Sequence, residues 1–261
     1  MQEIFMAGSE TTSSTTEWAL TELLRNPYSM IKAKAELTQV VGANQKVEES
    51  DIDNLPYLQA IMKETLRLHP PIPFLVPRIA IRDTNFMGFD LPKNTQVLVN
   101  AWAIGRDPDV WDDPLSFKPE RFIGTKIDYK GQHYELIPFG AGRRMCAGVP
   151  LAHRVLHLIL GSLLHKFDWE LDGNVTRETI DMKDRLGITI RKNEALLVLK
   201  NVMYRLREGE RESHFIERQL LAIHYLVLNS LTPVTNNPPS PKNKCTCLRK
   251  LKHYLVQGLS V

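Results

Sequence analysis

The chain has 261 residues, of which 43% are hydrophobic and 24% are charged, a composition typical of globular proteins and unlike that of disordered chains. The net charge of +3 divides unevenly: residues 1–200 carry 24 Lys and Arg against 26 Asp and Glu, a charge of −2, and residues 201–261 carry 9 against 4, a charge of +5. The main body therefore lacks the positive charge of a nucleic-acid-binding domain. Three cysteines, Cys146, Cys245 and Cys247, are too few for a disulfide framework and favour a reducing compartment.

Three helices are predicted in the first third of the chain. The first runs from the start to Asn26-Pro27, because proline disfavours helix at the residue before it. It begins in mid-pattern without a capping residue, so we expect the chain to start inside an element, as a fragment would. A second helix is predicted over residues 28–42. A third, over Pro56–Leu68, has apolar residues at helical spacing and is stopped by His69-Pro70-Pro71.

Prolines become frequent between residues 70 and 138, which predicts an ordered meander with short strands. Within it, residues 84–100 are predicted to form a hairpin that turns at Pro92-Lys93-Asn94. A further helix is predicted over Val149–Lys166, where the sequence is apolar almost all round except for His153, Arg154 and His157, so this helix should be deeply buried.

Residues 187–191 and 195–199 alternate around Lys192-Asn193-Glu194 and predict a closing hairpin. The expected fold class is therefore mainly α with small β-sheets. Residues 201–261 lose this pattern and are predicted to be a tail, partly helical or disordered. The longest apolar runs are shorter than the roughly 20 residues of a membrane-spanning helix, so we expect no membrane anchor in this chain.

A single cysteine lies in the glycine-rich stretch FGAGRRMCAG, residues 139–148. The helix predicted from Val149 directs the positive end of its dipole toward Cys146, and this would stabilise a thiolate. The glycines allow a close approach to a flat ligand, and Arg143 and Arg144 could pair with carboxylates on it. One alternative is a buried structural thiol. A zinc site lacks a second ligand at suitable spacing, and a nucleophilic cysteine would need a base that the sequence does not identify.

The same stretch resembles the haem-binding signature F-x-x-G-x-R-x-C-x-G of the cytochrome P450 family. The resemblance implies that Cys146 is the metal ligand, a thiolate bound to the iron of haem b. It also implies a cofactor-binding loop made by Phe139, Gly140, Gly142, Arg144 and Gly148.

Two further motifs resemble the family's structural elements. Glu64-Thr65-Leu66-Arg67 is similar to E-x-x-R, whose two charged residues share one helix face. Pro119-Glu120-Arg121-Phe122 is similar to the P-E-R-F motif. The resemblance implies a buried structural network of Glu64, Arg67 and Arg121, although an isolated E-x-x-R pair is usually a solvated surface pair.

Ala7–Thr12, AGSETT, resembles the A-G-x-[D/E]-T-T motif of the family's distal helix. The run of Ser and Thr that starts here is unfavourable for a helix, and such a local cost is expected at a functional site. The resemblance implies that Ala7 lies on the cofactor side and that Gly8 leaves room for dioxygen. Thr11 would donate a hydrogen bond to the oxygen, and Glu10 would relay protons. A merely polar helix face is the alternative.

The segment Pro70–Arg78, PPIPFLVPR, resembles the one that passes over the haem in relatives. Its apolar residues are candidates for a substrate pocket, and Arg78 for a partner of a haem propionate. A matching turn near the C-terminus adds Leu186 and Gly187 to the pocket. The same residues would also serve core packing. The candidates in the first segment are Ile72, Phe74, Leu75 and Val76.

The resemblance covers residues 1–200, the C-terminal half of a catalytic domain from distal helix to closing hairpin. Residues 5–27 and 143–171 look like plant microsomal enzymes of the geraniol 8-hydroxylase type. This implies a monooxygenase that hydroxylates a lipophilic, terpenoid-like metabolite with O2 and NADPH electrons from cytochrome P450 reductase, without a nucleic-acid partner. Full-length relatives lie on the cytosolic face of the endoplasmic reticulum membrane. The alternative is a catalytically silent fragment or pseudoenzyme, with Cys245 and Cys247 incidental.

Overall fold

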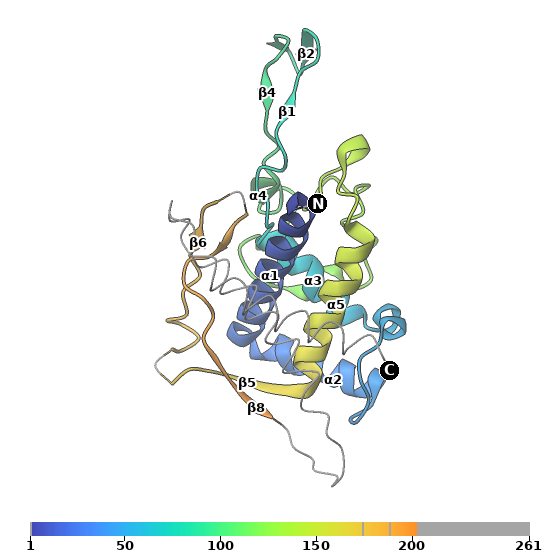
Figure 1. The fold of residues 1–261 in the computed structure, drawn as a ribbon, viewed down its shortest axis with the longest axis vertical. Coiled ribbons are helices and arrows are strands. Elements are labelled where there is room, and N and C mark those ends of the chain that lie inside the picture. The colour runs from blue at the N-terminus through green and yellow to red at the C-terminus, as the bar shows by residue number, and fades with distance from the viewer. Residues whose placement is uncertain (1, 174, 188, 203–261) are drawn as a thin grey trace, which may run out of the picture. The chain divides into compact units, whose positions relative to one another are not determined.

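Four long helices are observed almost where the sequence predicts them. The structure is a computed structural model that describes residues 2–173, 175–187 and 189–202, and these residues are mainly helical with small antiparallel sheets (Figure 1). The predicted fold class is confirmed. The predicted tail lies outside the described residues except for positions 201 and 202. The long helices are α1 (Gln2–Arg25), α2 (Pro27–Val41), α3 (Pro56–Leu68) and α5 (Val149–Lys166).

Shorter elements connect the long helices. Proline at the first position of α2 and of α3 starts each helix, since its fixed φ suits a helix and its missing N–H has no partner to lose there. Short helices are η1 (Glu49–Asn54), α4 (Ala101–Ile104), η2 (Pro119–Phe122) and η3 (Gly142–Arg144). The strands are β1 (Arg78–Ile79), β2 (Thr84–Phe86), β3 (Phe89–Leu91), β4 (Gln96–Val97), β5 (Phe167–Leu171), β6 (Asp184–Arg185), β7 (Arg191–Lys192) and β8 (Val198–Val202). None of the helices in the described ranges has the length and apolar character required to cross a membrane.

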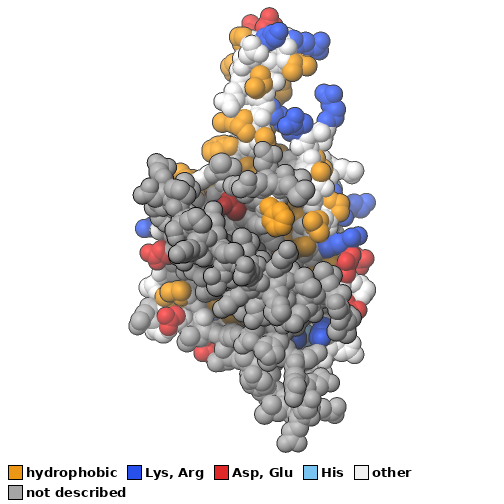
Figure 2. All heavy atoms as spheres, in the orientation of Figure 1, with side chains coloured by type: hydrophobic (Ala, Val, Ile, Leu, Met, Phe, Trp, Pro, Cys, Tyr) orange, Lys and Arg blue, Asp and Glu red, His pale blue; other side chains and the backbone are white. Residues whose placement is uncertain are grey.

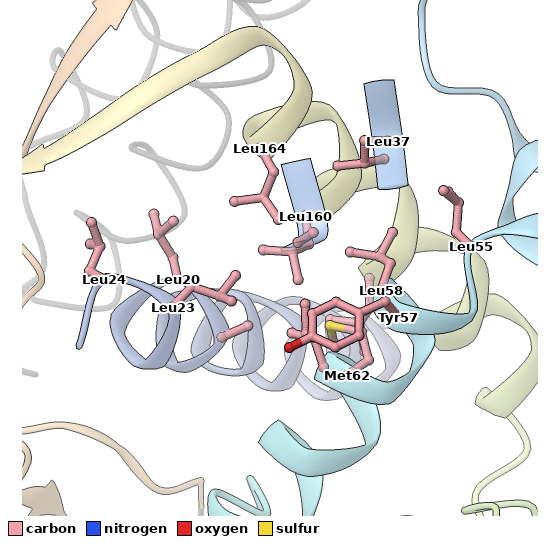
Figure 3. Close-up of a cluster of buried hydrophobic side chains, with 14 of the residues drawn as sticks. Leu20, Leu23, Leu24, Leu37, Leu55, Tyr57, Leu58, Met62, Leu160 and Leu164 are labelled. Atoms are coloured by element: carbon pink, nitrogen blue, oxygen red, sulfur yellow. The ribbon is translucent and has the colours of Figure 1, made fainter. Parts of the chain in front are cut away.

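The four long helices share one hydrophobic core, shown in close-up in Figure 3. Leu23, Leu37, Leu58 and Leu160, one from each helix, are fully buried. Gly161 lets α5 approach closely, because a Cβ at this position would lie 3.3 Å from a methyl carbon of Leu58. Packing of apolar faces, more than helix propensity, therefore holds the bundle together.

The prediction that α5 is deeply buried holds for one face of the helix and is wrong at Leu151. Leu151 is 67% exposed, and Arg154 forms an exposed ion pair with Glu49 at 2.8 Å. The helix buries one face against the core instead, and that face includes His157, which is only 1% exposed.

Burial lowers the pKa of His157 to about 4, so its imidazole is neutral in the folded chain at neutral pH. The unfolded chain takes up this proton near pH 6.5, and the folded chain does so only near pH 4. The free energy of unfolding is therefore expected to fall by about 1–2 kcal/mol between pH 6.5 and pH 5 through this group. Urea unfolding at both pH values checks this. His157→Gln should show a smaller pH dependence than the wild type, because it removes the buried imidazole. Equal pH dependence in the wild type and His157→Gln would contradict the assignment.

The hairpin between residues 78 and 97 turns at a different place from the one predicted. Strands β2 and β3 pair antiparallel, with Phe86 opposite Phe89, so the chain reverses at Met87-Gly88. Both turn residues have positive φ (51° and 87°), as a tight two-residue hairpin turn requires. The predicted turn at residues 92–94 is real but only bends the chain: the Thr95 N–H donates to the Pro92 carbonyl at 3.1 Å. Strands β1 and β4 then pair below it.

This hairpin has almost no buried side chain of its own. Backbone pairing holds it, and hydrophobic side chains lie on its surface, visible as orange atoms in the upper part of Figure 2. The exposed hydrophobic residues of the hairpin include Ile79, Ile81, Phe86, Met87 and Phe89.

The predicted closing hairpin is also wrong in its pairing. Strand β7 pairs with β6, with Arg191 opposite Arg185, whereas β8 pairs with β5, which follows α5 directly. The reversal lies near Gly187, where a Cβ would be 3.1 Å from the Thr189 carbonyl oxygen, so a side chain here would crowd the turn. A five-residue partner strand at β5 gives β8 more backbone hydrogen bonds than the short 187–191 segment would.

Candidate functional site

Cys146 lies three residues before the start of α5, in a loop that turns through left-handed backbone conformations. Gly140 and Gly142 have φ values of 75° and 68°, which residues with a side chain adopt at a cost. The Cys146 N–H donates to the Phe139 carbonyl at 3.0 Å and closes the loop, while the residue itself is exposed. A Cβ at Gly148 would lie 3.6 Å from the sulfur, so the start of α5 passes beside it. The loop therefore presents an accessible sulfur at a helix N-terminus.

Two side chains of this loop pack against a second hydrophobic cluster. Phe139 and Met145 pack against buried residues that include Tyr129 and Val149. The rings of Tyr129 and Phe139 lie 5.4 Å apart between centroids. The Tyr129 hydroxyl and His153 Nδ1, on α5, are 2.5 Å apart. Burial raises the pKa of Tyr129, so its phenol stays protonated. The loop is thus fixed by packing on both sides of the cysteine.

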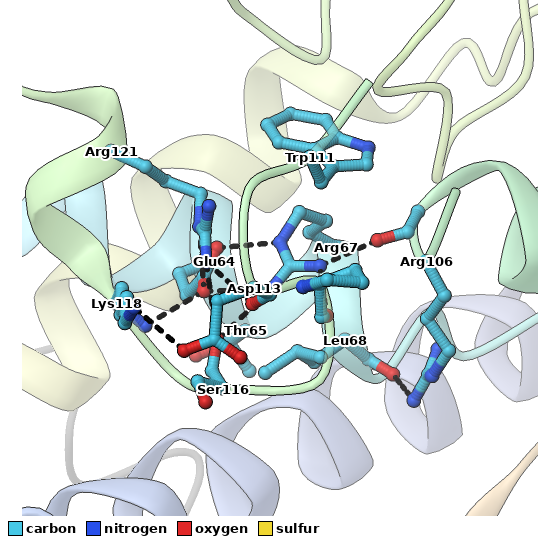
Figure 4. A network of polar contacts seen from close by, with 12 residues as sticks. Glu64, Thr65, Arg67, Leu68, Arg106, Trp111, Asp113, Ser116, Lys118 and Arg121 are labelled. Carbon is cyan, nitrogen blue, oxygen red and sulfur yellow. Dashed lines mark hydrogen bonds and ion pairs between the residues drawn. The ribbon is translucent and has the colours of Figure 1, made fainter. Parts of the chain in front are cut away.

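Glu64, Arg67 and Arg121 meet in one buried network (Figure 4). Arg67 binds the Glu64 carboxylate with two hydrogen bonds of 2.7 Å, and both side chains are fully buried. Arg121 Nε donates to Glu64 Oε1 at 3.1 Å. The Lys118 N–H donates to the same oxygen at 2.8 Å. The network is therefore a structural link between α3 and η2.

The remaining donors of Arg67 reach three backbone carbonyls of the meander. They bind Gly105 at 2.5 Å, Pro114 at 2.7 Å and Ser116 at 3.2 Å. The indole ring of Trp111 lies 5.3 Å from the guanidinium, and Figure 4 shows it above the network. The buried charge thus has both an anionic partner and a full set of acceptors, as stability requires.

The distal-helix motif lies on α1, where its hydroxyl groups bind the helix itself. Thr11 Oγ1 donates to the Ala7 carbonyl at 2.6 Å and Thr12 Oγ1 to the Gly8 carbonyl at 2.6 Å. Such bonds to the preceding turn explain how a run of Ser and Thr is accommodated in a helix. A Cβ at Gly8 would meet no atom within 4 Å, so there is open space beside this residue.

The segment of residues 70–78, which follows α3, contacts the cysteine loop. Arg78 Nη2 donates to the Ala141 carbonyl at 3.3 Å, and a Leu75 methyl carbon lies 3.8 Å from where a Gly140 Cβ would be. Leu75 has a φ of 53°, an unfavourable conformation for a bulky residue that costs about 1–2 kcal/mol. Strained residues of this kind gather at functional sites.

A series of contacts runs from α1 to this segment. Ser14 Oγ donates to the Ile190 carbonyl at 2.7 Å, and the Ile190 N–H donates to the Pro71 carbonyl at 2.8 Å. The segment that starts at Pro71 then contacts the cysteine loop. Three of the four predicted parts of the site, the distal helix, the pocket segment and the cysteine loop, are thereby joined.

The other predicted pocket residues differ in exposure. Phe74 and Val76 are 48% and 63% exposed, whereas Ile72 and Leu75 are partly buried. Leu186 is 82% exposed, and a Cβ at Gly187 would meet the backbone of Thr189 within the same turn. The assignment of Leu186 and Gly187 to a pocket stays a prediction.

Sequence reasoning missed an ion pair at this site. Arg191 on β7 binds the Glu10 carboxylate on α1. No local motif identifies this partner, because the two residues lie near opposite ends of the described chain. The only signal was the position of two adjacent cations, Arg191 and Lys192, in an alternating segment.

Comparison with known proteins agrees with this geometry. Residues 1–198 match the family model for Cytochrome P450. Cytochrome P450 76A1 of Solanum melongena is 65% identical over 197 residues, which are 76% of this chain and 42% of the relative. From Catharanthus roseus, iridoid oxidase is 60% identical over 199 residues (76% and 39%) and geraniol 8-hydroxylase 53% over 201 residues (77% and 41%).

Among solved structures, a zebrafish cytochrome P450 determined with abiraterone superimposes with a TM-score of 0.70 at 36% identity, covering 78% of this chain and 46% of that one. The described fold is that of a cytochrome P450. The chain belongs to the cytochrome P450 family and resembles its plant members. It spans about two fifths of the length of the curated relatives it matches.

Proposed function

We propose that the chain contributes the cofactor-holding part of a haem–thiolate monooxygenase that oxidises a lipophilic, terpenoid-like plant metabolite. The electrons would come from NADPH through NADPH–cytochrome P450 reductase, at the cytosolic face of the endoplasmic reticulum membrane. One observation carries the proposal: an exposed cysteine, fixed in a glycine loop before α5, is joined by continuous contacts to the helix that bears Thr11. The names of two relatives, geraniol 8-hydroxylase and iridoid oxidase, support a terpenoid-like substrate.

The residues around Cys146 fit a haem. The thiol is exposed, and a Cβ at Gly142 would meet no atom within 4 Å, so the loop leaves room for a flat ligand. Arg144 and Arg78 are exposed cations on and beside the loop, available to the haem carboxylates. Cys146 would supply the axial ligand. When bound, the haem supplies the redox chemistry that places one atom of O2 in a C–H bond and releases the other as water.

Glu10 and Thr11 on α1 would transfer protons from solvent to the oxygen. The open space beside Gly8 admits a small molecule such as O2. The Thr11 hydroxyl donates to Ala7 in this structure, so it must rotate away from that carbonyl before it can donate to oxygen. The Glu10 side chain is 30% exposed and can take a proton from water. A proton would thus pass from solvent to Glu10 and, through Thr11 or a water molecule, to the oxygen.

Thr11→Ala should uncouple NADPH consumption from product formation, because it removes the hydroxyl that delivers the proton. The product formed per NADPH is expected to fall by about tenfold or more, with peroxide released instead. Both are measured in the reductase-supported reaction. Ser13→Ala is the matched control, since Ser13 makes the same type of bond to the preceding turn, to the Ser9 carbonyl at 2.8 Å. Unchanged coupling in Thr11→Ala would count against the proton-delivery role.

The proposed reaction itself is tested with ¹⁸O2. The haem-loaded chain, NADPH, the reductase and geraniol as probe substrate should give a product that contains one ¹⁸O atom and depends on NADPH. A chain that binds haem but gives no such product with geraniol or related monoterpenoids would contradict the activity. That result would favour the alternative, a catalytically silent fragment or pseudoenzyme.

A further inference from the structure

Strand β7 contacts the distal helix at the motif assigned to proton delivery. The Arg191 guanidinium forms an ion pair with Glu10 Oε1. One helical turn further along, Ser14 Oγ donates to the carbonyl of the neighbouring residue, Ile190, at 2.7 Å. Residues four apart lie on the same face of a helix, so β7 follows this face of α1. Glu10 therefore belongs to an interface between α1 and β7.

The same interface continues beyond Ser14. Glu17 Oε1 accepts a hydrogen bond of 2.9 Å from the Leu196 N–H, and Lys192 Nζ lies 5.0 Å from the ring centroid of Trp18. Burial raises the pKa of Glu17 and lowers that of Lys192, as expected where charged groups are enclosed between two elements. Helix α1 and the segment 190–196, which contains β7, are thus in contact at several successive turns of the helix.

The backbone that carries Arg191 is held on its other side as well. Arg191 is paired with Arg185 of β6, and the preceding residue, Ile190, donates its N–H to the Pro71 carbonyl at 2.8 Å. The Arg191 guanidinium therefore reaches Glu10 from a backbone whose position is fixed. Geometry of this kind restricts the directions in which a carboxylate can point.

The two side chains lie at the border between protein and solvent. Glu10 is 30% and Arg191 29% exposed. A carboxylate that takes protons from water and passes them into the protein has to contact both the solvent and the protein interior. A partly exposed carboxylate such as that of Glu10 can do both. An exposed glutamate without a fixed partner would sample many rotamers.

We propose that Arg191 is a positioning residue for proton delivery, which holds the Glu10 carboxylate on the face of α1 that carries Ser14. The inference rests on the proposed function, in which Glu10 relays protons. In the step concerned, a proton moves from water to the Glu10 carboxylate and on to the Thr11 hydroxyl or a water, which gives its own proton onward. The carboxylate is regenerated, and no electron moves.

The pairing is tested first without haem. The ¹³C carboxyl resonance of Glu10 is compared in the full chain, in Arg191→Met and in Arg185→Met. The Arg185 control removes an exposed cation from the neighbouring strand. Loss of the ion pair should shift the Glu10 resonance in Arg191→Met and leave it in place in Arg185→Met. An unmoved resonance in Arg191→Met would overturn the inference, whether or not the chain is active.

The second arm uses the haem-loaded enzyme with NADPH and reductase. Peroxide released per NADPH should rise about two- to fivefold in Arg191→Met, the range expected for the loss of a partly exposed ion pair. Arg191→Lys keeps the positive charge and should restore part of the coupling between NADPH use and product formation. It also tests the ion pair if Arg191→Met does not fold. In a Glu10→Gln background, Arg191→Met should cause no further rise in the peroxide released per NADPH.

An additive effect in the double variant would show that Arg191 does not act through Glu10. Absence of product in the wild type would instead contradict the proposed function, and the resonance would still decide the pairing.

Discussion

Arg67→Ala is expected to lower the free energy of unfolding by about 3–5 kcal/mol, because it leaves the buried Glu64 carboxylate without its main partner. The loss includes more than one ion pair. Arg67 also donates to the carbonyls of Gly105, Pro114 and Ser116, and these acceptors would be left in a partly or fully buried environment. The contact between α3 and the meander is expected to loosen first.

Urea unfolding of the full chain measures this effect. Arg67→Lys should also destabilise strongly, since a single ammonium group cannot make the two parallel bonds to Glu64. Arg154→Ala is the matched control: its pair with Glu49 has 57% and 56% exposed side chains and should contribute at most about 1 kcal/mol. Equal effects of Arg67→Ala and Arg154→Ala would contradict a structural role for the network.

Cys146→Ala should weaken haem binding by more than about 100-fold, because it removes the proposed bond to the iron, and loss of even the groups that orient metal ligands typically costs 10- to 100-fold. Titration of the apoprotein with haem, followed by absorbance, measures the change. The double variant Cys245→Ala with Cys247→Ala is the control. Its two cysteines, which lie outside the described residues, are predicted to be incidental, so haem affinity should not change. Equal affinity of the wild type and Cys146→Ala would remove Cys146 as the ligand.

The sequence predicted the helices well because their ends carry strong local signals. Pro27 and Pro56 start α2 and α3, and the apolar pattern of α5 ends where its core contacts end. Strand pairing was less predictable. The proline-containing signal at residues 92–94 is a true turn, yet the chain reverses at Met87-Gly88, since only the register of the paired strands distinguishes a bend from a hairpin end.

In the candidate site too, the residues of local motifs were predictable from the sequence and the contacts set by tertiary packing were not. Motifs placed Glu64, Arg67 and Arg121 in one network, and the structure brings them together. The carbonyl acceptors of Arg67 were not predictable, because backbone groups carry no sequence signature. The Glu10–Arg191 pair was missed for a related reason: its geometry depends on how β7 lies against α1, which is set by tertiary packing.

The central claim is that Cys146 is the thiolate ligand of a haem. The reduced, carbon monoxide-bound difference spectrum of the purified chain tests this most directly. The account predicts a strongly red-shifted Soret band in the wild-type chain that is absent in Cys146→Ala and retained in the Cys245→Ala, Cys247→Ala variant. A chain that takes up haem but gives no red-shifted band, or a band that persists in Cys146→Ala, would contradict it.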